Sequence, residues 1–210
     1  MDQSEKPRFV LFTPPIADAA AFAPVLAAAC RSADIAAIVL RLAPASDAEQ
    51  LARIQLLAPT ARDIDAVLLL DSLTQLVAPA NAGGVFVNEG VSAARKSVNN
   101  DHVVGAGRLE SRHEAMIAAE NGADFVLFGD ANAESGRPTM PSLIERVTWW
   151  AELFVIPCVA YAAHTDEIEP LVRAGADFVA LGEEAVWNSA EGPEAALAAA
   201  NARLGVAEHA

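Results

Sequence analysis

The sequence is poor in positive charge. Lysine and arginine together number 14 against 28 aspartates and glutamates, which gives a formal net charge of -14 and an isoelectric point near 4.5. Nucleic acids and anionic membranes are bound by basic surfaces, so neither is expected as a partner. A small anionic ligand would need a local cluster of the few basic residues.

Lysine is the scarcer of the two cations, since Lys6 and Lys96 are the only lysines in the chain. The first lies in the polar N-terminal stretch and the second lies within a helical pattern. Neither ends a strand-like run, whereas a Schiff-base aldolase needs a desolvated lysine inside its active site. The sequence therefore argues against Schiff-base chemistry.

Cysteine and long apolar runs are also rare. Cys30 and Cys158 are far apart and form no CxxC pair, so both are predicted to be small buried side chains. No apolar run approaches the roughly 20 residues of a membrane span, and the N-terminus lacks the apolar core of a signal peptide. We expect a cytoplasmic protein without a membrane segment.

Aromatic residues make up only 6% of the chain, although 53% of its residues are hydrophobic. This balance, rich in alanine, leucine and valine, favours helices packed on a parallel sheet. A repeat supports the same class. Residues 121–130 (NGADFVLFGD) recur almost letter for letter as residues 174–183 (AGADFVALGE), and residues 82–89 are a weaker copy. Each copy leads from a helical pattern through glycine into a short apolar strand, which describes an αβ unit.

Such units continue along the whole chain. Strand patterns occur at residues 8–13, 36–42, 65–70, 85–87, 103–105, 125–128, 156–161 and 178–181. Helical patterns follow them at residues 18–31, 47–58, 72–80, 92–98, 111–121, 140–154, 165–174 and 193–204. A doubly wound open sheet would carry a glycine-rich fingerprint after its first strand, and residues 13–18 contain no glycine. We therefore predict a single-domain (β/α)8 TIM barrel over residues 1–210, with tails at residues 1–7 and 206–210.

Function in such a barrel lies in the loops that follow the carboxyl ends of the strands. The residues at these positions are Thr13, Arg41, Asp71, Asn88 with Glu89, Gly107 with Arg108, Gly129 with Asp130, Tyr161 with His164, and Gly182 with Glu183. The candidate site residues among them are Arg41, Asp71, Glu89, Arg108, Asp130, His164 and Gly182. Arg41 is either a solvated charge or a clamp for an oxyanion. Asp71 is either the cap of the next helix or a metal ligand or general base, and Glu89 is a similar candidate.

Gly182 and His164 also have a competing interpretation each. Gly182 opens the last loop, where bare N–H groups bind phosphate in many barrels, but Glu183 and Glu184 follow it directly. His164 begins a helix, where an exposed structural position competes with a catalytic one.

Several of these stretches resemble the thiamine phosphate synthase family, including its thiazole tautomerase relatives. The resemblance rests on residues 103–129 with their Gly-Ala-Asp turn, on residues 156–160, and on the second Gly-Ala-Asp turn in residues 174–179. It covers most of the chain. It implies a barrel that joins a pyrimidine diphosphate to a thiazole phosphate, with Mg²⁺ and basic side chains stabilising the departing diphosphate.

The family's functional motifs are kept at Arg41 and Asp71. Arg41 matches the arginine of the Gln-Leu-Arg-x-Lys segment, and Asp71 matches the metal-type aspartate of Asn-Asp-Arg. Elsewhere residues 86–91 lack the second metal carboxylate, residues 108–110 replace Ser-x-His, residues 130–137 lack the lysine, and residues 162–163 are Ala-Ala instead of Gly-Gly. The resemblance thus implies Arg41 as the phosphate anchor and Asp71 as the Mg²⁺ ligand, with weak synthase activity.

Three functions fit these observations. The chain is an enzyme of thiamine metabolism with altered chemistry, such as a tautomerase-like step, or a non-catalytic binding descendant of the fold. Alternatively it is an unrelated barrel enzyme that uses Asp71 and Glu89 as acid and base. Each predicts a small-molecule ligand in the barrel mouth, and assembly into a homo-oligomer stays open.

Overall fold

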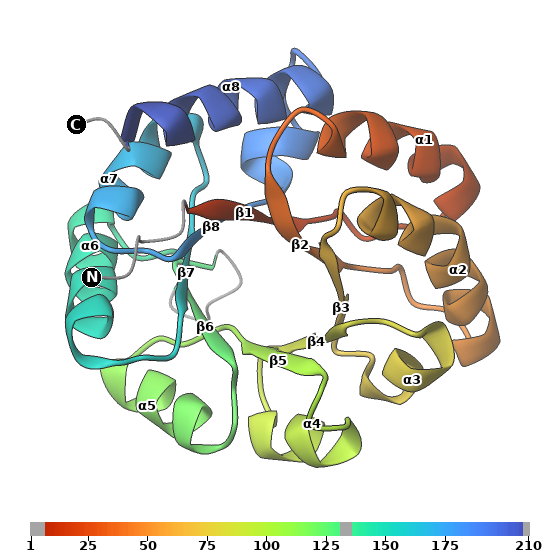
Figure 1. The fold of residues 1–210 in the computed structure, drawn as a ribbon, viewed down its shortest axis with the longest axis horizontal. Helices are drawn as coiled ribbons and strands as arrows, with labels where there is room; N and C mark the ends of the chain where they lie inside the picture. Colours follow the sequence, from red (N-terminus) through yellow and green to blue (C-terminus); the bar gives the residue numbers. More distant parts are fainter. Residues whose placement is uncertain (1–6, 131–135, 208–210) are drawn as a thin grey trace.

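The strands form a closed parallel barrel. The computed structural model describes residues 7–130 and 136–207, and within it each strand pairs with the next while β8 pairs with β1. The strands are β1 (Arg8–Phe12), β2 (Ile35–Leu40), β3 (Val67–Asp71), β4 (Gly84–Val87), β5 (Val103–Ala106), β6 (Phe125–Phe128), β7 (Cys158–Tyr161) and β8 (Phe178–Leu181). Figure 1 looks along the barrel and shows the helices as an outer ring. The predicted TIM barrel is confirmed.

The helices agree with the sequence pattern in order and differ in extent. They are α1 (Ala19–Cys30), α2 (Asp47–Asp63), α3 (Val77–Ala80), α4 (Val91–Ser97), α5 (Arg112–Glu120), α6 (Met140–Leu153), α7 (Ile168–Arg173) and α8 (Pro193–Ala207). Short turns precede three of them: the 3₁₀ turns η1 (Thr74–Leu76) and η2 (Thr165–Glu167), and the π-helical turn η3 (Glu183–Trp187).

Two boundaries correct the prediction. The helix expected at residues 72–80 starts late, because Ser72 takes a positive φ of 60° and its N–H donates to Phe86 O at 2.8 Å. The C-terminal tail expected from residue 206 also starts later, since α8 continues to residue 207. Of the predicted tails, residues 1–6 and 208–210 lie outside the described residues.

Alternating side chains divide the hydrophobic residues into two layers. In β1, Val10 and Phe12 belong to the cluster inside the barrel, whereas Phe9 and Leu11 belong to the larger cluster beneath the helices. The Phe12 ring lies 5.1 Å from the Phe86 ring and 6.2 Å from the Tyr161 ring, centroid to centroid. Side chains therefore fill the barrel interior, and aromatic rings lie beneath its carboxyl-end mouth.

The repeated Gly-Ala-Asp turns have a structural explanation. Gly122 and Gly175 end α5 and α7 with φ values of 94° and 98°, a region that favours glycine. The aspartates that follow accept hydrogen bonds from the preceding strand: Asp124 Oδ2 from Val104 N at 2.7 Å, and Asp177 Oδ2 from Cys158 N at 2.8 Å. These hydrogen bonds join neighbouring αβ units at the amino end of the barrel, away from the mouth.

The last unit closes onto the first. The Trp187 indole N–H in η3 donates to Phe12 O at the end of β1, at 2.7 Å. Its ring lies 5.1 Å from that of Phe22 in α1. In Figure 1, α8 accordingly lies between α7 and α1.

Both cysteines are buried as predicted, and burial raises the pKa of each thiol to about 12. They are therefore protonated and unreactive near neutral pH. Across the described part of the chain, no helix has the length and apolar character needed to cross a membrane.

Candidate functional site

Arg41 stands at the carboxyl end of β2 and is fixed there by a buried threonine. The backbone N–H of Arg41 donates to Thr13 Oγ1 at 2.9 Å, and the Thr13 hydroxyl donates to the backbone carbonyl oxygen of Arg41 at 3.4 Å. Thr13 is fully buried at the end of β1. The start of the Arg41 side chain is thus held by two neighbouring strands.

The Arg41 guanidinium is paired with two carboxylates of the mouth. Its Nη1 lies 3.0 Å from Glu183 Oε1, after β8, and its Nε lies 3.8 Å from Asp71 Oδ2, at the end of β3. The exposed fractions of the three side chains are 24% for Arg41, 37% for Glu183 and 25% for Asp71. The positive charge of Arg41 is therefore largely compensated inside the chain.

Asp71 has the perturbed proton affinity of a candidate acid or base. Burial raises the pKa of its carboxyl, and the charge of Asp130 raises it further, whereas a hydrogen bond from Ser72 Oγ at 3.0 Å and the charge of Arg41 lower it. Burial is the largest of these effects, so the net pKa is raised. Asp71 is thus better suited to proton transfer than an ordinary aspartate.

Tyr161, at the end of β7, closes the mouth on the side of the last loop. Its hydroxyl donates to Glu184 Oε2 at 2.6 Å. A Cβ at Gly182 would lie 2.3 Å from the Tyr161 hydroxyl oxygen, so only glycine allows this approach. Desolvation and the Glu184 carboxylate raise the pKa of the phenol, which keeps it a hydrogen-bond donor. Gly182 makes room for Tyr161 in this structure.

Glu167, in η2, is a buried carboxylate surrounded by donors. Arg137 binds it with both guanidinium arms, Nη1 to Oε1 at 2.9 Å and Nη2 to Oε2 at 2.5 Å. Glu167 Oε2 also accepts from Ala163 N at 2.8 Å, and Arg137 Nη2 donates to Tyr161 O at 3.1 Å. This set links the chain before α6 to the loop after β7.

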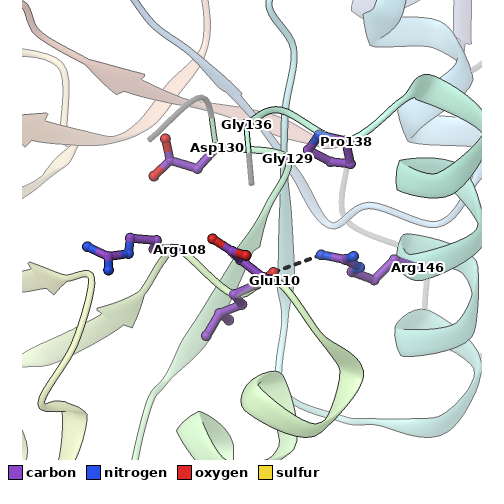
Figure 2. A pocket seen from close by; sticks show the side chains of 8 residues that line it. Arg108, Glu110, Gly129, Asp130, Gly136, Pro138 and Arg146 are labelled. Atoms are coloured by element: carbon purple, nitrogen blue, oxygen red, sulfur yellow. Dashed lines mark hydrogen bonds between the residues drawn. The ribbon is translucent and has the colours of Figure 1, made fainter. Parts of the chain in front are cut away.

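A pocket opens between the loops after β5 and β6. Its lining residues are Arg108, Leu109, Glu110, Gly129, Asp130, Gly136, Pro138 and Arg146, around about 290 Å³ of free space that includes its open side. Figure 2 shows Arg146 approaching from α6, where its Nη1 donates to Leu109 O at 2.8 Å, while Arg108 and Asp130 extend on the other side. Two arginines thus border this pocket.

Two residues with side chains have a left-handed backbone at the mouth. Ser72 and Arg108, just after β3 and β5, have φ values of 60° and 53°. Such left-handed conformations are uncommon for residues with a side chain and are found frequently at functional sites. Asp65 and Asn81, with φ values of 54° and 49°, lie before β3 and β4 at the amino end, so positive φ does not by itself mark the functional face.

The structure brings together some of the candidate residues and separates others. Arg41 and Asp71 are in contact, and Gly182 lies against the Tyr161 ring and hydroxyl. Arg108 and Asp130 line the pocket. Glu89 and His164 are exposed on the loops after β4 and β7, and neither is an ion-pair partner of Arg41.

Glu167 and Arg137 were not among the sequence candidates. Tyr161 was placed at the end of its strand by the sequence but was given no role, although it is the only tyrosine of the chain. Glu167 stands three residues after His164, the spacing of a capping box, which concealed its contact with Arg137.

Both the sequence and the fold are similar to those of thiamine phosphate synthases. A sequence model described as thiamine monophosphate synthase matches residues 9–185. The thiamine-phosphate synthase of Rhodospirillum centenum is 41% identical over 197 residues, covering 91% of this chain and 94% of that protein. That of Hyphomonas neptunium is 33% identical over 205 residues, covering 93% and 92%. The solved thiamine phosphate pyrophosphorylase of Pyrococcus furiosus shares the fold, with a TM-score of 0.81, 20% identity, and coverage of 97% and 98%.

Proposed function

The chain belongs to the thiamine monophosphate synthase family, and from this membership we propose that it binds a small phosphorylated heterocycle in its barrel mouth, with synthase activity far below that of a complete family site. The ligand class is that of the thiazole monophosphate used in this chemistry. The proposed setting is thiamine metabolism in the cytoplasm.

The pairing of Arg41 is the observation that carries the proposal. A site that releases diphosphate must stabilise several developing negative charges with preorganised cations. The cation kept from the family's clamp is already shared between Glu183 at 3.0 Å and Asp71 at 3.8 Å. Additional negative charge from a diphosphate is therefore poorly matched here, whereas a single phosphate demands less.

The pocket between the loops after β5 and β6 is the proposed position of that phosphate. Arg108 and Arg146 border it, and Gly129 lines it on the β6 side. Arginine suits a phosphate because its planar guanidinium donates two parallel hydrogen bonds. The heterocycle would then extend towards Asp71 and Arg41.

The mouth fits Mg²⁺ only in cooperation with a ligand. Asp71 and Asp130 provide the hard oxygen atoms that Mg²⁺ prefers, and Asp130 lies close enough to raise the pKa of Asp71. Within residues 7–130 and 136–207, however, no three acidic, histidine or cysteine side chains gather into a metal site. Asp71 and Asp130 would therefore hold Mg²⁺ together with phosphate oxygens, where the ion would neutralise phosphate charge.

A tautomerase-like proton transfer is the second candidate. The raised pKa of Asp71 favours it, because a carboxyl titrating closer to neutral pH exchanges a proton more readily in both directions. Asp71 would take a proton from the bound heterocycle and return it at another atom. Such a step requires no departing diphosphate.

Calorimetry with the thiazole phosphate and with the pyrimidine diphosphate, each with and without Mg²⁺, tests the binding proposal. We expect the thiazole phosphate to bind, and Arg41→Ala and Arg108→Ala each to weaken it about tenfold or more, since a hydrogen bond to a charged group contributes about 1.5–3 kcal/mol. Arg31→Ala is the matched control, because Arg31 is exposed at the far end of α1.

A coupled assay for thiamine phosphate tests the lost activity. Removing one preorganised donor costs about 10²- to 10³-fold in rate. Absence of thiazole phosphate binding would refute the binding proposal. Product formation at the rate of a fully equipped synthase would refute the loss of activity.

A further inference from the structure

Arg146 is a half-buried arginine of α6 whose side chain reaches the pocket between the loops after β5 and β6 (Figure 2). Its Nη1 donates to the backbone carbonyl oxygen of Leu109 at 2.8 Å. In the part of the chain that the structure describes, Arg146 belongs to none of the ion pairs. Its positive charge is therefore met by a neutral oxygen atom instead of a carboxylate.

This lack of a carboxylate does not result from a shortage of acids. The chain has 28 acidic residues against 14 lysines and arginines, and three other partly buried arginines each pair with a carboxylate: Arg41 with Asp71 and Glu183, Arg95 with Asp124, and Arg137 with Glu167. Glu145 directly precedes Arg146 in α6 but pairs with Arg112 of α5. Withdrawing a charge from water without an opposite charge costs free energy, which an anionic ligand would recover.

Arg146 also differs from the other charged side chains that line the pocket. Arg108, Glu110 and Asp130 each already have an interaction partner. An arginine carries several N–H donors in one planar fork, and Nη1 of Arg146 provides the bond to Leu109. Among the described residues, the buried side-chain atoms without a partner include no nitrogen atom of Arg146. Its remaining donors are therefore accessible from the open side of the pocket.

We propose that Arg146 is the anion-binding residue of this pocket and that its remaining N–H groups bind a phosphate group, as inorganic phosphate or as a phosphate ester. Two parallel N–H groups of a guanidinium match two phosphate oxygens. The bond to Leu109 adds a second role, because Leu109 directly follows Arg108, whose φ is 53°. Arg146 thus binds the anion and holds the backbone that presents Arg108. The inference rests on the proposed function, which places a phosphate here, and names the side chain that supplies the charge.

The test uses inorganic phosphate as its first probe and the thiazole phosphate as its second. Each is titrated by calorimetry into wild type and Arg146→Leu in magnesium-free buffer at fixed ionic strength. Leucine keeps the apolar start of the side chain and removes every donor. We expect Arg146→Leu to bind phosphate about tenfold more weakly or worse, because it loses hydrogen bonds from a charged donor.

Arg53→Leu is the matched control. Arg53 is half-buried on α2, and its Nη1 donates to the backbone carbonyl oxygen of Ala43, in the loop after β2, at 2.9 Å. The control therefore makes the same change in charge and breaks the same kind of bond between an outer helix and a loop of the mouth. Arg53 does not line the pocket. We expect it to leave the phosphate affinity unchanged.

NMR separates contact with phosphate from a purely structural role. The Nε–H signal of Arg146 is identified by its disappearance in Arg146→Leu, and that of Arg53 by its disappearance in Arg53→Leu. During titration of the wild type with inorganic phosphate, we expect the Arg146 signal to shift and the Arg53 signal to stay in place. A structural link to Leu109 alone would leave both signals in place.

Three results would overturn the inference: no phosphate binding by the wild type, an affinity of Arg146→Leu equal to that of the wild type, or an equal loss of affinity in Arg53→Leu. The thiazole phosphate tests the proposed function separately. If it binds the wild type but does not depend on Arg146, this inference alone fails. If it does not bind while inorganic phosphate binds through Arg146, the proposed function fails and the anion site remains.

Discussion

Replacing Glu167 by alanine is expected to destabilise the barrel strongly. The change removes both hydrogen bonds from Arg137 and the one from Ala163 N, and it leaves a largely buried guanidinium whose Nε already lacks a partner. Breaking one side of a buried ion pair costs about 3–5 kcal/mol. The Arg137 side chain is 23% exposed, which places the cost at the lower end, about 3 kcal/mol.

The reverse change is expected to cost less. In Arg137→Ala the Glu167 carboxylate keeps its hydrogen bond from Ala163 N at 2.8 Å, so we expect a cost of about 2 kcal/mol. Glu169→Ala is the control, because Glu169 pairs with the exposed Arg173 four residues along α7. Such a surface pair contributes about 0.5 kcal/mol or less.

Urea denaturation and thermal melting measure these costs. A loss of 3 kcal/mol corresponds to a fall in Tm of about 6–12 °C for a chain of this size. The expected order of destabilisation is Glu167→Ala, then Arg137→Ala, then Glu169→Ala. If Glu167→Ala has the same Tm as Glu169→Ala, the buried carboxylate does not hold this part of the mouth together and the reasoning is wrong.

Three further experiments have expected outcomes. Because the folded-state pKa of Asp71 is raised, its contribution to stability is full at low pH and is lost as pH rises through that pKa, so Asp71→Asn should melt no lower than wild type at neutral pH. Cys30 and Cys158, with each pKa raised to about 12, should resist a disulfide reagent at mildly alkaline pH in the folded protein and react once it is unfolded; fast reaction of folded protein would contradict their burial. Gly84→Ala should abolish soluble barrel, because its Cβ would lie 2.0 Å from Val103 O, whereas Gly205→Ala, which meets nothing within 4 Å, should keep or raise the Tm.

The barrel could be predicted because its signals are local. The glycine that ends a helix and the apolar residues of the next strand stand side by side in the sequence, as in residues 121–130. The start of α3 could not be predicted, because the positive φ of Ser72 is accompanied by a hydrogen bond to Phe86 in the neighbouring strand. Local propensity contains no information about that contact.

The candidate site could be predicted only where the order of the strands brings its residues together. Arg41 and Asp71 end consecutive strands of a parallel barrel, so their proximity follows from the fold. The pair of Arg137 and Glu167 joins residues 30 positions apart, and the hydrogen bond of Tyr161 to Glu184 depends on the space left by Gly182 in the loop after β8. Such pairings depend on side-chain directions, which the sequence pattern leaves undetermined.

Closure of the barrel has a consequence for the nascent chain. One edge of β1 pairs with β2 early in synthesis, but its other edge can pair with β8 only when residues 178–181 have been made. The hydrogen bond from the Trp187 indole to Phe12 O forms later still. At translation rates of about 5–20 residues per second, the first strand waits roughly 10–30 s with an open edge. During that time the edge can pair with another chain. Ribosome-bound chains that stop before β8 should therefore remain sensitive to protease and depend on chaperones, while chains that extend through α8 should become resistant in a single step.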